Sequence, residues 1–350
     1  MFFTSDNAAG VHPDILAAVA RAGAGPAMAY GADPLTAGVE ARIREVFEAP
    51  EARAYLVATG TAANALALAC LCPPWATVYG HAGSHIETDE CAATEFYTGG
   101  SKLTLIGGAD ARIDAAELAE KIRTATPHGV HNVQNGALSI TQATELGALY
   151  SLDEIARLTA IAREAGIGVH MDGSRFANAV VRLGCTPAEA SWKAGVDILC
   201  LGATKNGAMG SEAVIIFDPA KAWEFELRRK RGGHLFSKMR FIAAQMDAYL
   251  TDDLWLTMAG HANAMADRLA AGIASAPGCK VLNTVEANMI FAELPLAAHR
   301  RLQAEGARYY PAHGGQDETG PDDAPYTARL VASFETTEAE ADRFIAVLRG

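Results

Sequence analysis

Strand-like and helix-like segments alternate along this chain from residue 34 to residue 218, an order that few folds accommodate. Apolar residues at helical spacing predict helices over 34–48, 113–122 and 151–166. Segment 54–71 begins as a strand and becomes a helix rich in alanine and leucine after the turn Thr59-Gly60-Thr61. Further strands are predicted over 77–81, 103–108, the start of 137–147, 167–172, 197–204 and 212–218. The alternation predicts an α/β fold with a mostly parallel seven-stranded sheet and helices on its faces.

A second pattern begins near residue 254. A helix is predicted over 261–275, two strands over 279–283 and 287–294, a helix over 296–306, a strand over 328–334 and a closing helix over 337–350. This order predicts a smaller C-terminal α/β domain over 254–350, after a large domain over 1–253 that includes the N-terminal segment.

Charge and cysteine content narrow the class of protein. The 350 residues carry a net charge of −12, which argues against a nucleic acid or an anionic membrane as partner. No apolar run reaches the roughly 18 residues of a membrane span, and the start "MFFTSDNAAG" lacks the features of a signal peptide. The 6 cysteines form no CxxC pair, so we expect reduced thiols and a cytoplasmic protein.

The stretch "ILCLGATKNGAMGSEAVIIF" (198–217) places Lys205 just beyond a predicted strand, among small residues. An exposed loop lysine is the ordinary interpretation, because lysine is rarely buried without a partner. The alternative is a lysine whose amine takes part in chemistry. In α/β sheets of this kind, ligands bind beyond the carboxyl ends of the strands, which is where Lys205 lies.

Three other positions complete a set that pyridoxal 5′-phosphate (PLP) requires. This cofactor needs a lysine for its aldehyde, a carboxylate for its pyridine nitrogen, a phosphate site and a flat group over the ring. Asp172 ends the preceding strand, Gly60-Thr61 opens a helix whose N–H groups favour phosphate, and His85 follows a strand. Taken singly, these are a turn aspartate, a helix start and a surface or core histidine. Their combination in this order favours PLP.

Several longer motifs resemble one known family. They are "SDN" (5–7), "YGADP" (30–34), "ATGTAAN" (58–64), "HIETDE" (85–90), "HMDGSRFANA" (170–179), "LGATKNG" (201–207) and "ARLVASF" (328–334). The chain resembles the L-threonine aldolases over nearly its whole length, and most closely their bacterial low-specificity branch, with "ITQATE" (140–145) and "SKMRF" (237–241). The resemblance implies fold-type-I PLP architecture and a homotetramer with active sites at subunit interfaces. The implied reaction is the cleavage of L-threonine, L-allo-threonine or related β-hydroxy-α-amino acids, such as phenylserine, to glycine and an aldehyde.

The resemblance also implies roles for individual residues. Lys205, His85 and Asp172 match the catalytic positions, and Gly60 and Thr61 match the phosphate loop. Cofactor contacts are further expected from Arg175 and, across a subunit interface, from Arg231 or Lys238 in the segment 228–240. Ser5, Arg175 and Arg329 match the residues that hold the substrate carboxylate. The full set of expected substrate-binding residues is Ser5, Tyr30, His85, Asp89, Glu145, Arg175 and Arg329.

Two of these positions depart from the family pattern. Glu145 stands where many relatives carry a second histidine, and Asp89 stands where many carry an aromatic residue. Both lie where the β-substituent is expected, so the group that takes the β-hydroxyl proton and the preference between β-epimers stay open.

Other classes of protein fit the sequence less well. His81 and His85 are spaced like metal ligands, but Gly83 lies between them and no HExxH motif is present, so we expect no metal site. "GAGPAM" (23–28) lacks the third glycine of a dinucleotide-binding loop. A PLP-dependent β-eliminating lyase and a non-catalytic PLP-fold protein that binds amino acids remain the alternatives, because one fold hosts many functions.

Overall fold

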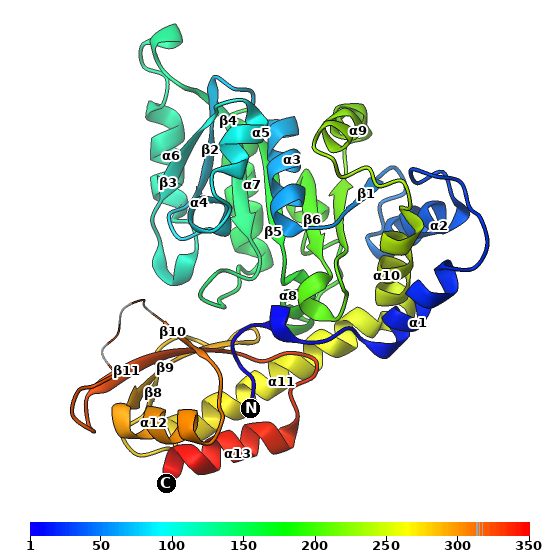
Figure 1. The fold of residues 1–350 in the computed structure, drawn as a ribbon. Coiled ribbons are helices and arrows are strands. Elements are labelled where there is room, and N and C mark those ends of the chain that lie inside the picture. The colour runs from blue at the N-terminus through cyan, green and yellow to red at the C-terminus, as the bar shows by residue number, and fades with distance from the viewer. Residues whose placement is uncertain (313, 315, 317) are drawn as a thin grey trace.

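The computed structural model describes all residues except 313, 315 and 317, and it shows two α/β parts side by side (Figure 1). The strands of the larger part are β1 (Arg53–Val57), β2 (Ala76–His81), β3 (Lys102–Ile106), β4 (Gln134–Thr141), β5 (Gly168–Gly173), β6 (Ile198–Gly202) and β7 (Glu212–Ile216). They form one 7-stranded sheet in the order β1-β7-β6-β5-β4-β2-β3. Only the pairs of β7 with β1 and β6 are antiparallel, which confirms the predicted mostly parallel sheet.

Helices cover this sheet and connect its strands. They are α1 (Pro13–Ala22), α2 (Pro34–Val46), α3 (Gly60–Leu71), α4 (His85–Thr88), α5 (Ala93–Thr98), α6 (Ala115–Thr124), α7 (Leu152–Glu164), α8 (Phe176–Leu183), α9 (Ala222–Arg231) and α10 (Arg240–Leu250). The short 3₁₀ turns are η1 (Asp6–Ala8), η2 (Ala109–Ala111), η3 (Gly129–His131), η4 (Trp192–Ala194), η5 (Thr204–Asn206), η6 (Pro219–Lys221) and η7 (Thr251–Asp253). Helix α7 begins with the predicted capping box of Ser151 and Glu154, and α6 begins at the predicted N-cap Asp114.

Helix α3 is central to the position of the site. Its residues are almost all apolar, with no polar stripe, and the helix is buried on every side against α5, α9 and the middle strands. Its first residues lie at the carboxyl end of β1, so this buried helix presents its N-terminus to the same sheet edge as the ends of β5 and β6.

The smaller part contains an antiparallel sheet in the order β10-β11-β9-β8. Its elements are α11 (Leu254–Ala274), β8 (Lys280–Val281), β9 (Met289–Pro295), α12 (Leu296–Ala304), β10 (Tyr310–Pro311), β11 (Pro325–Val331) and α13 (Glu338–Arg349). The helix predicted over 261–275 therefore begins earlier, at Leu254. Its first turns bury one face, with Trp255, Met258 and Ala259, and the helix packs against α8 and α10 of the larger part.

The N-terminal segment links the two parts. Phe3 is buried in the core of the smaller part with Ile290 and Phe344, while η1 packs against η5 of the larger part. In Figure 1 the blue N-terminal turn lies between the two parts. The boundary between residues 253 and 254 stays a prediction. Among the described residues, no helix combines the length and the apolar character needed to cross a membrane.

Candidate active site

A cavity of about 370 Å³ lies beyond the carboxyl ends of the parallel strands. Lys205 in η5, His85 at the start of α4 and Thr61 at the start of α3 all line it. The strand ends bring these residues together although they are far apart in the sequence. The cavity thus forms where the fold class predicts a ligand.

Asp172 is buried at the end of β5 beneath this cavity. Its Oδ1 accepts hydrogen bonds from the Ser174 amide (2.9 Å) and hydroxyl (2.8 Å), and its Oδ2 accepts one from Asn64 Nδ2 (2.9 Å). Burial alone raises the pKa of Asp172, but the Lys205 ammonium and the Ser174 donors outweigh this, so the pKa is lowered. The carboxylate is therefore fixed in position and ionised.

Lys205 is only partly exposed, and its amine faces a mixture of charges. Burial and the positive charge of Arg175 lower the pKa of Lys205, against the raising effects of Asp6 and Asp172. A lowered pKa increases the fraction of free amine, which is the nucleophilic form. Lys205 is therefore not the exposed loop residue of the ordinary interpretation.

His85 is held on two sides. Its Nδ1 lies 2.8 Å from Oε1 of Glu90, whose side chain is 0% exposed, and its main-chain N–H donates to Oε1 of Glu145 at 2.7 Å. The hydrogen bond with Glu90 raises the pKa of His85 more than burial lowers it, so the pKa is raised. Asn64 Nδ2 also donates to Glu90 Oε1, at 2.8 Å, so this single amide joins Glu90 to Asp172.

The predicted carboxylate-binding residues lie where the two parts meet. Arg175 donates through Nε (2.7 Å) and Nη2 (2.8 Å) to the buried carboxylate of Asp6, which also accepts a hydrogen bond from Asn288 (3.0 Å). Within the described part of the chain, the Arg329 guanidinium, on β11, donates hydrogen bonds only to the Thr4 carbonyl (3.4 Å) and to Met289 Sδ (3.6 Å). Burial and the charge of Arg175 lower the pKa of Arg329. An arginine that is partly buried without a carboxylate partner is suited to an anionic ligand.

The start of α3 offers free hydrogen-bond donors. Thr59 caps the helix through its hydroxyl, which accepts from the Ala62 amide at 3.2 Å. In the described residues the main-chain N–H groups of Gly60 and Thr61 have no acceptor, and both residues line the cavity. Free N–H groups at the positive end of a helix favour a phosphate.

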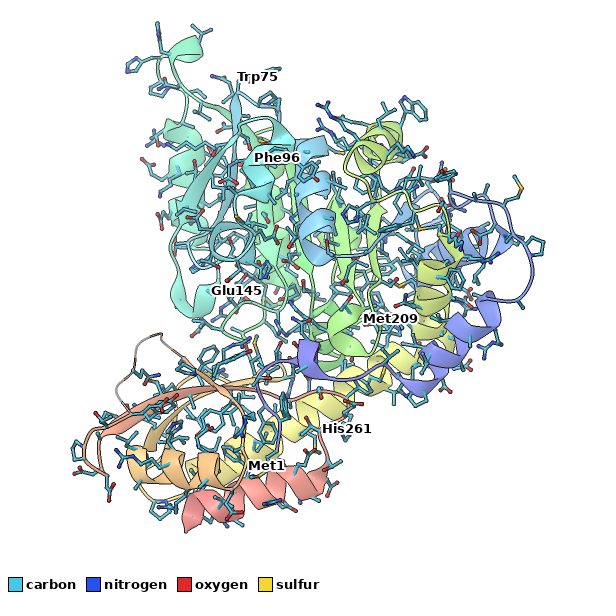
Figure 2. All side chains as sticks on the ribbon, in the orientation of Figure 1. Met1, Trp75, Phe96, Glu145, Met209 and His261 are labelled. Carbon is cyan, nitrogen blue, oxygen red and sulfur yellow. The ribbon has the colours of Figure 1, made fainter. Side chains whose placement is uncertain are left out.

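Other predicted residues stand at the edge of this site or away from it. Asp89 lines the cavity and is exposed, with Oδ2 accepting from the Thr88 hydroxyl at 2.7 Å. Glu145 lies on the loop after β4, where Figure 2 shows it at the edge of the larger part that faces the smaller one. Ser5 caps η1, accepts from the Asn7 amide at 3.2 Å and lines a separate cavity of about 200 Å³.

Tyr30, Arg231 and Lys238 do not reach the cavity within a single chain. The Tyr30 amide donates to the Ser237 carbonyl at 3.0 Å, which places the segment around Tyr30 beside the segment that contains Lys238. A contact between these residues and a cofactor would need a second subunit, so their roles stay predictions.

The sequence did not reveal several residues of the site, namely Asp6, Asn64, Glu90, Ser174 and Glu212. Glu212 of β7 lines the cavity and accepts hydrogen bonds from the Thr204 hydroxyl and the Ala203 amide, and burial raises its pKa to about 7. One available signal was Asn64, a single polar side chain in an otherwise apolar helix, which requires a buried polar partner.

His85, Glu90 and Asp172 bring their potential ligand atoms within 4.8 Å of one another. The Asn64 amide donates hydrogen bonds to both carboxylates, so it occupies the space between them with positive N–H groups. Because this amide already donates a hydrogen bond to one oxygen of each carboxylate, we assign no metal to the cluster. His81, the other histidine considered, bonds instead to the Gly108 carbonyl at 3.2 Å.

Comparison with known proteins matches this arrangement. A family model described as beta-eliminating lyase covers residues 3–295. The chain belongs to the beta-eliminating lyase family. It is 42% identical over 308 residues to a low specificity L-threonine aldolase of Pseudomonas aeruginosa, covering 88% of both chains. It is 38% identical to a second protein of that name from a Pseudomonas species, covering 99% of this chain and 96% of the relative.

Solved structures share the fold of this chain. A threonine aldolase from Leishmania major superposes with a TM-score of 0.91 at 27% identity, covering 99% of this chain and 98% of that one. A serine palmitoyltransferase from Sphingomonas wittichii superposes with a TM-score of 0.72 at 14% identity, covering 100% of this chain and 86% of that one, and shows the fold alone. The predicted fold-type-I architecture and the resemblance to threonine aldolases are confirmed.

Proposed function

We propose that this protein is a PLP-dependent aldehyde-lyase that cleaves L-threonine, L-allo-threonine and related β-hydroxy-α-amino acids, phenylserine among them, to glycine and an aldehyde. The observation that carries this proposal is one cavity lined by Lys205 and the free N–H groups of α3. The buried carboxylate of Asp172 lies beneath it, bonded to Asn64 and Ser174 of the lining. Low specificity L-threonine aldolases at 42% and 38% identity support the same reaction.

The residues present fit the cofactor. Lys205 would attach its aldehyde, Asp172 would pair with its pyridine nitrogen, and the N–H groups of Gly60 and Thr61 would hold its phosphate. His85 would lie over the ring. When bound, PLP supplies an electron-withdrawing system next to the amino group of the substrate.

The protein's own part in the reaction is to bind and orient the amino acid. Nε and Nη2 of Arg175 already donate hydrogen bonds to Asp6, so Arg175 would bind the substrate carboxylate through Nη1. Arg329 would meet the same carboxylate from β11, with Ser5 nearby in the N-terminal segment. Because these groups come from both parts of the chain, binding of the substrate would join the two parts across the cavity.

The assembly proposed is a homotetramer with active sites shared between subunits. Met28, Tyr30 and Phe236 are 70%, 53% and 37% exposed, and their segments lie side by side. Exposed apolar side chains in one region favour a subunit contact. Such a contact would bring Tyr30, Arg231 or Lys238 to a neighbouring cavity. Light scattering of the purified protein tests the assembly, and a monomer would contradict it.

A cytoplasmic location is also proposed, supported by 6 cysteines that are all free.

The test of the activity is a spectrum of the purified protein before and after L-threonine, with acetaldehyde and glycine assayed in the same cuvette. We expect a cofactor absorbance band that shifts on addition and the two products in equal amounts. Lys205→Ala should abolish both the band of covalently attached cofactor and turnover, because no amine remains to hold the aldehyde. Ammonia and a keto acid in place of glycine would indicate β-elimination, and wild-type turnover in Lys205→Ala would overturn the assignment.

A further inference from the structure

Glu90 and His85 form a pair, called here the Glu90–His85 dyad, whose geometry defines the orientation of the imidazole. His85 Nδ1 and Glu90 Oε1 are 2.8 Å apart, and the Glu90 side chain is 0% exposed whereas that of His85 is 36% exposed. A carboxylate only accepts hydrogen bonds, so in a pair of imidazole and Glu90 carboxylate it is Nδ1 that carries the proton. Nε2, on the opposite edge of the ring, has no partner among the described residues and belongs to a side chain that lines the cavity.

The remaining contacts hold the dyad rigidly. Asn64 Nδ2 donates to the same Glu90 oxygen at 2.8 Å, and the Glu145 carboxylate accepts from the His85 main chain at 2.7 Å. The carboxylate therefore has a fixed rotamer and the histidine has a fixed backbone. An imidazole backed by a buried carboxylate gains basicity at its far nitrogen, as in the triads of acyl-transfer enzymes.

We propose that Glu90 is a positioning residue that keeps His85 as the Nδ1–H tautomer and stabilises the imidazolium formed when Nε2 takes the β-hydroxyl proton of the substrate. This role belongs to the cleavage reaction proposed above and rests on it. The O–H electron pair forms the carbonyl of the departing aldehyde, and the pair of the Cα–Cβ bond stays with Cα. Cα takes up a proton from the solvent to give glycine, and His85 passes the proton at Nε2 to the solvent, which restores the neutral imidazole and leaves no net change in protons.

Charges around the imidazole agree with this role. Glu90 and Asp172 favour the protonated ring, whereas Lys205 and burial oppose it, and the pKa of His85 is raised overall. Other proton acceptors beside the cavity are less available. The Asp172 carboxylate accepts hydrogen bonds from Ser174 and Asn64. The Glu212 carboxylate accepts hydrogen bonds from Thr204 and Ala203. Asp89 is exposed and accepts a hydrogen bond from the Thr88 hydroxyl.

The first experiment measures the dyad directly in the cofactor-free protein. With ¹³C-labelled histidine, the His85 ring signal is assigned from its loss in His85→Gln and titrated by NMR in the wild type, Glu90→Gln and Glu87→Gln. Glu87 is exposed on the same helix, so its variant is the matched control. We expect a midpoint above the ordinary 6.5 in the wild type and the control, and a lower midpoint in Glu90→Gln. A wild-type midpoint at or below 6.5, or an unshifted one in Glu90→Gln, would overturn the proposal.

The second experiment separates this role from a general structural one. Exchange of the glycine α-proton with solvent deuterium uses the loaded site but needs no β-hydroxyl proton transfer. Glu90→Gln should lower kcat for L-threonine by ~100-fold, a typical contribution of a positioned general base, while glycine exchange stays within about 3-fold. The acid limb of the kcat profile should also move to lower pH, and Glu90→Asp should recover part of the loss. An equal loss in both reactions with an unmoved pH profile would refute the proposal. A wild-type protein inactive in both reactions would instead refute the proposed function.

Discussion

The ion pair of Asp6 with Arg175 yields a quantitative prediction about stability. Asp6 is 2% exposed, and its carboxylate receives hydrogen bonds at 2.7 and 2.8 Å from an arginine side chain that is 10% exposed. Asp6→Asn keeps the shape and one acceptor oxygen but removes the negative charge. The Arg175 guanidinium then lies buried near Lys205 and Arg329 without a counter-charge. Breaking one partner of a buried pair costs roughly 3–5 kcal/mol, and the retained oxygen favours the lower end, about 3 kcal/mol.

The assay is thermal unfolding at one protein concentration, because assembly affects the apparent stability. For a chain of 350 residues, with an unfolding entropy of about 2.1 cal/mol/K per residue, a loss of about 3 kcal/mol lowers the melting temperature by roughly 4 °C. Asp14→Asn is the control, since the Asp14 side chain is 78% exposed and should change little. The double variant Asp6→Asn, Arg175→Met should recover most of the loss, because no unpaired charge remains. A melting temperature for Asp6→Asn equal to that of Asp14→Asn would refute the reasoning.

The same pair has a defined pH dependence. Burial raises the pKa of Asp6, but Arg175 more than offsets it, so the folded-state pKa lies below the ordinary 3.8. A depressed carboxyl pKa contributes stability that is present above the unfolded value and lost as the pH falls through the folded one. The difference between the wild type and Asp6→Asn should therefore be constant near neutral pH and shrink below about pH 3.8.

Two further predictions concern the substrate side of the cavity. Arg329→Ala should raise KM for L-threonine by about 10- to 100-fold, because a hydrogen bond to a charged group is worth roughly 1.5–3 kcal/mol. Arg308→Ala is the control, since Arg308 is exposed. An unchanged KM in Arg329→Ala would exclude Arg329 from carboxylate binding. Burial raises the pKa of Glu145 to about 7, so infrared difference spectra between the wild type and Glu145→Gln should show a protonated carboxyl band that disappears as the pH rises through about 7. A Glu145 band that is already lost by pH 5 would show a solvated carboxylate instead.

The sequence by itself determined the fold class and predicted the residues at the centre of the site. Periodicity changes from strand to helix along residues 54–218, and this alternation is a local property of the chain, so a single sequence reveals it. Lys205, Asp172 and the Gly60-Thr61 turn follow predicted strands, and parallel strands end at one edge of a sheet. Their gathering at one edge of the sheet was therefore predictable: Lys205, Gly60 and Thr61 line the cavity, and Asp172 lies bonded to Asn64 and Ser174, which line it too.

Only the tertiary structure decided how these groups are held and charged. Asn64 and Glu90 are 26 residues apart, and Asn64 and Asp172 are 108 apart, yet one amide joins all three. Asp6 and Arg175 are separated by 169 residues, and their bidentate pair uses Nε and Nη2 of Arg175. Such contacts depend on the path of the chain between distant segments, and pKa shifts depend on burial that arises only when the parts pack together. Sequence pattern identifies which residues reach the site, whereas packing sets their protonation and orientation.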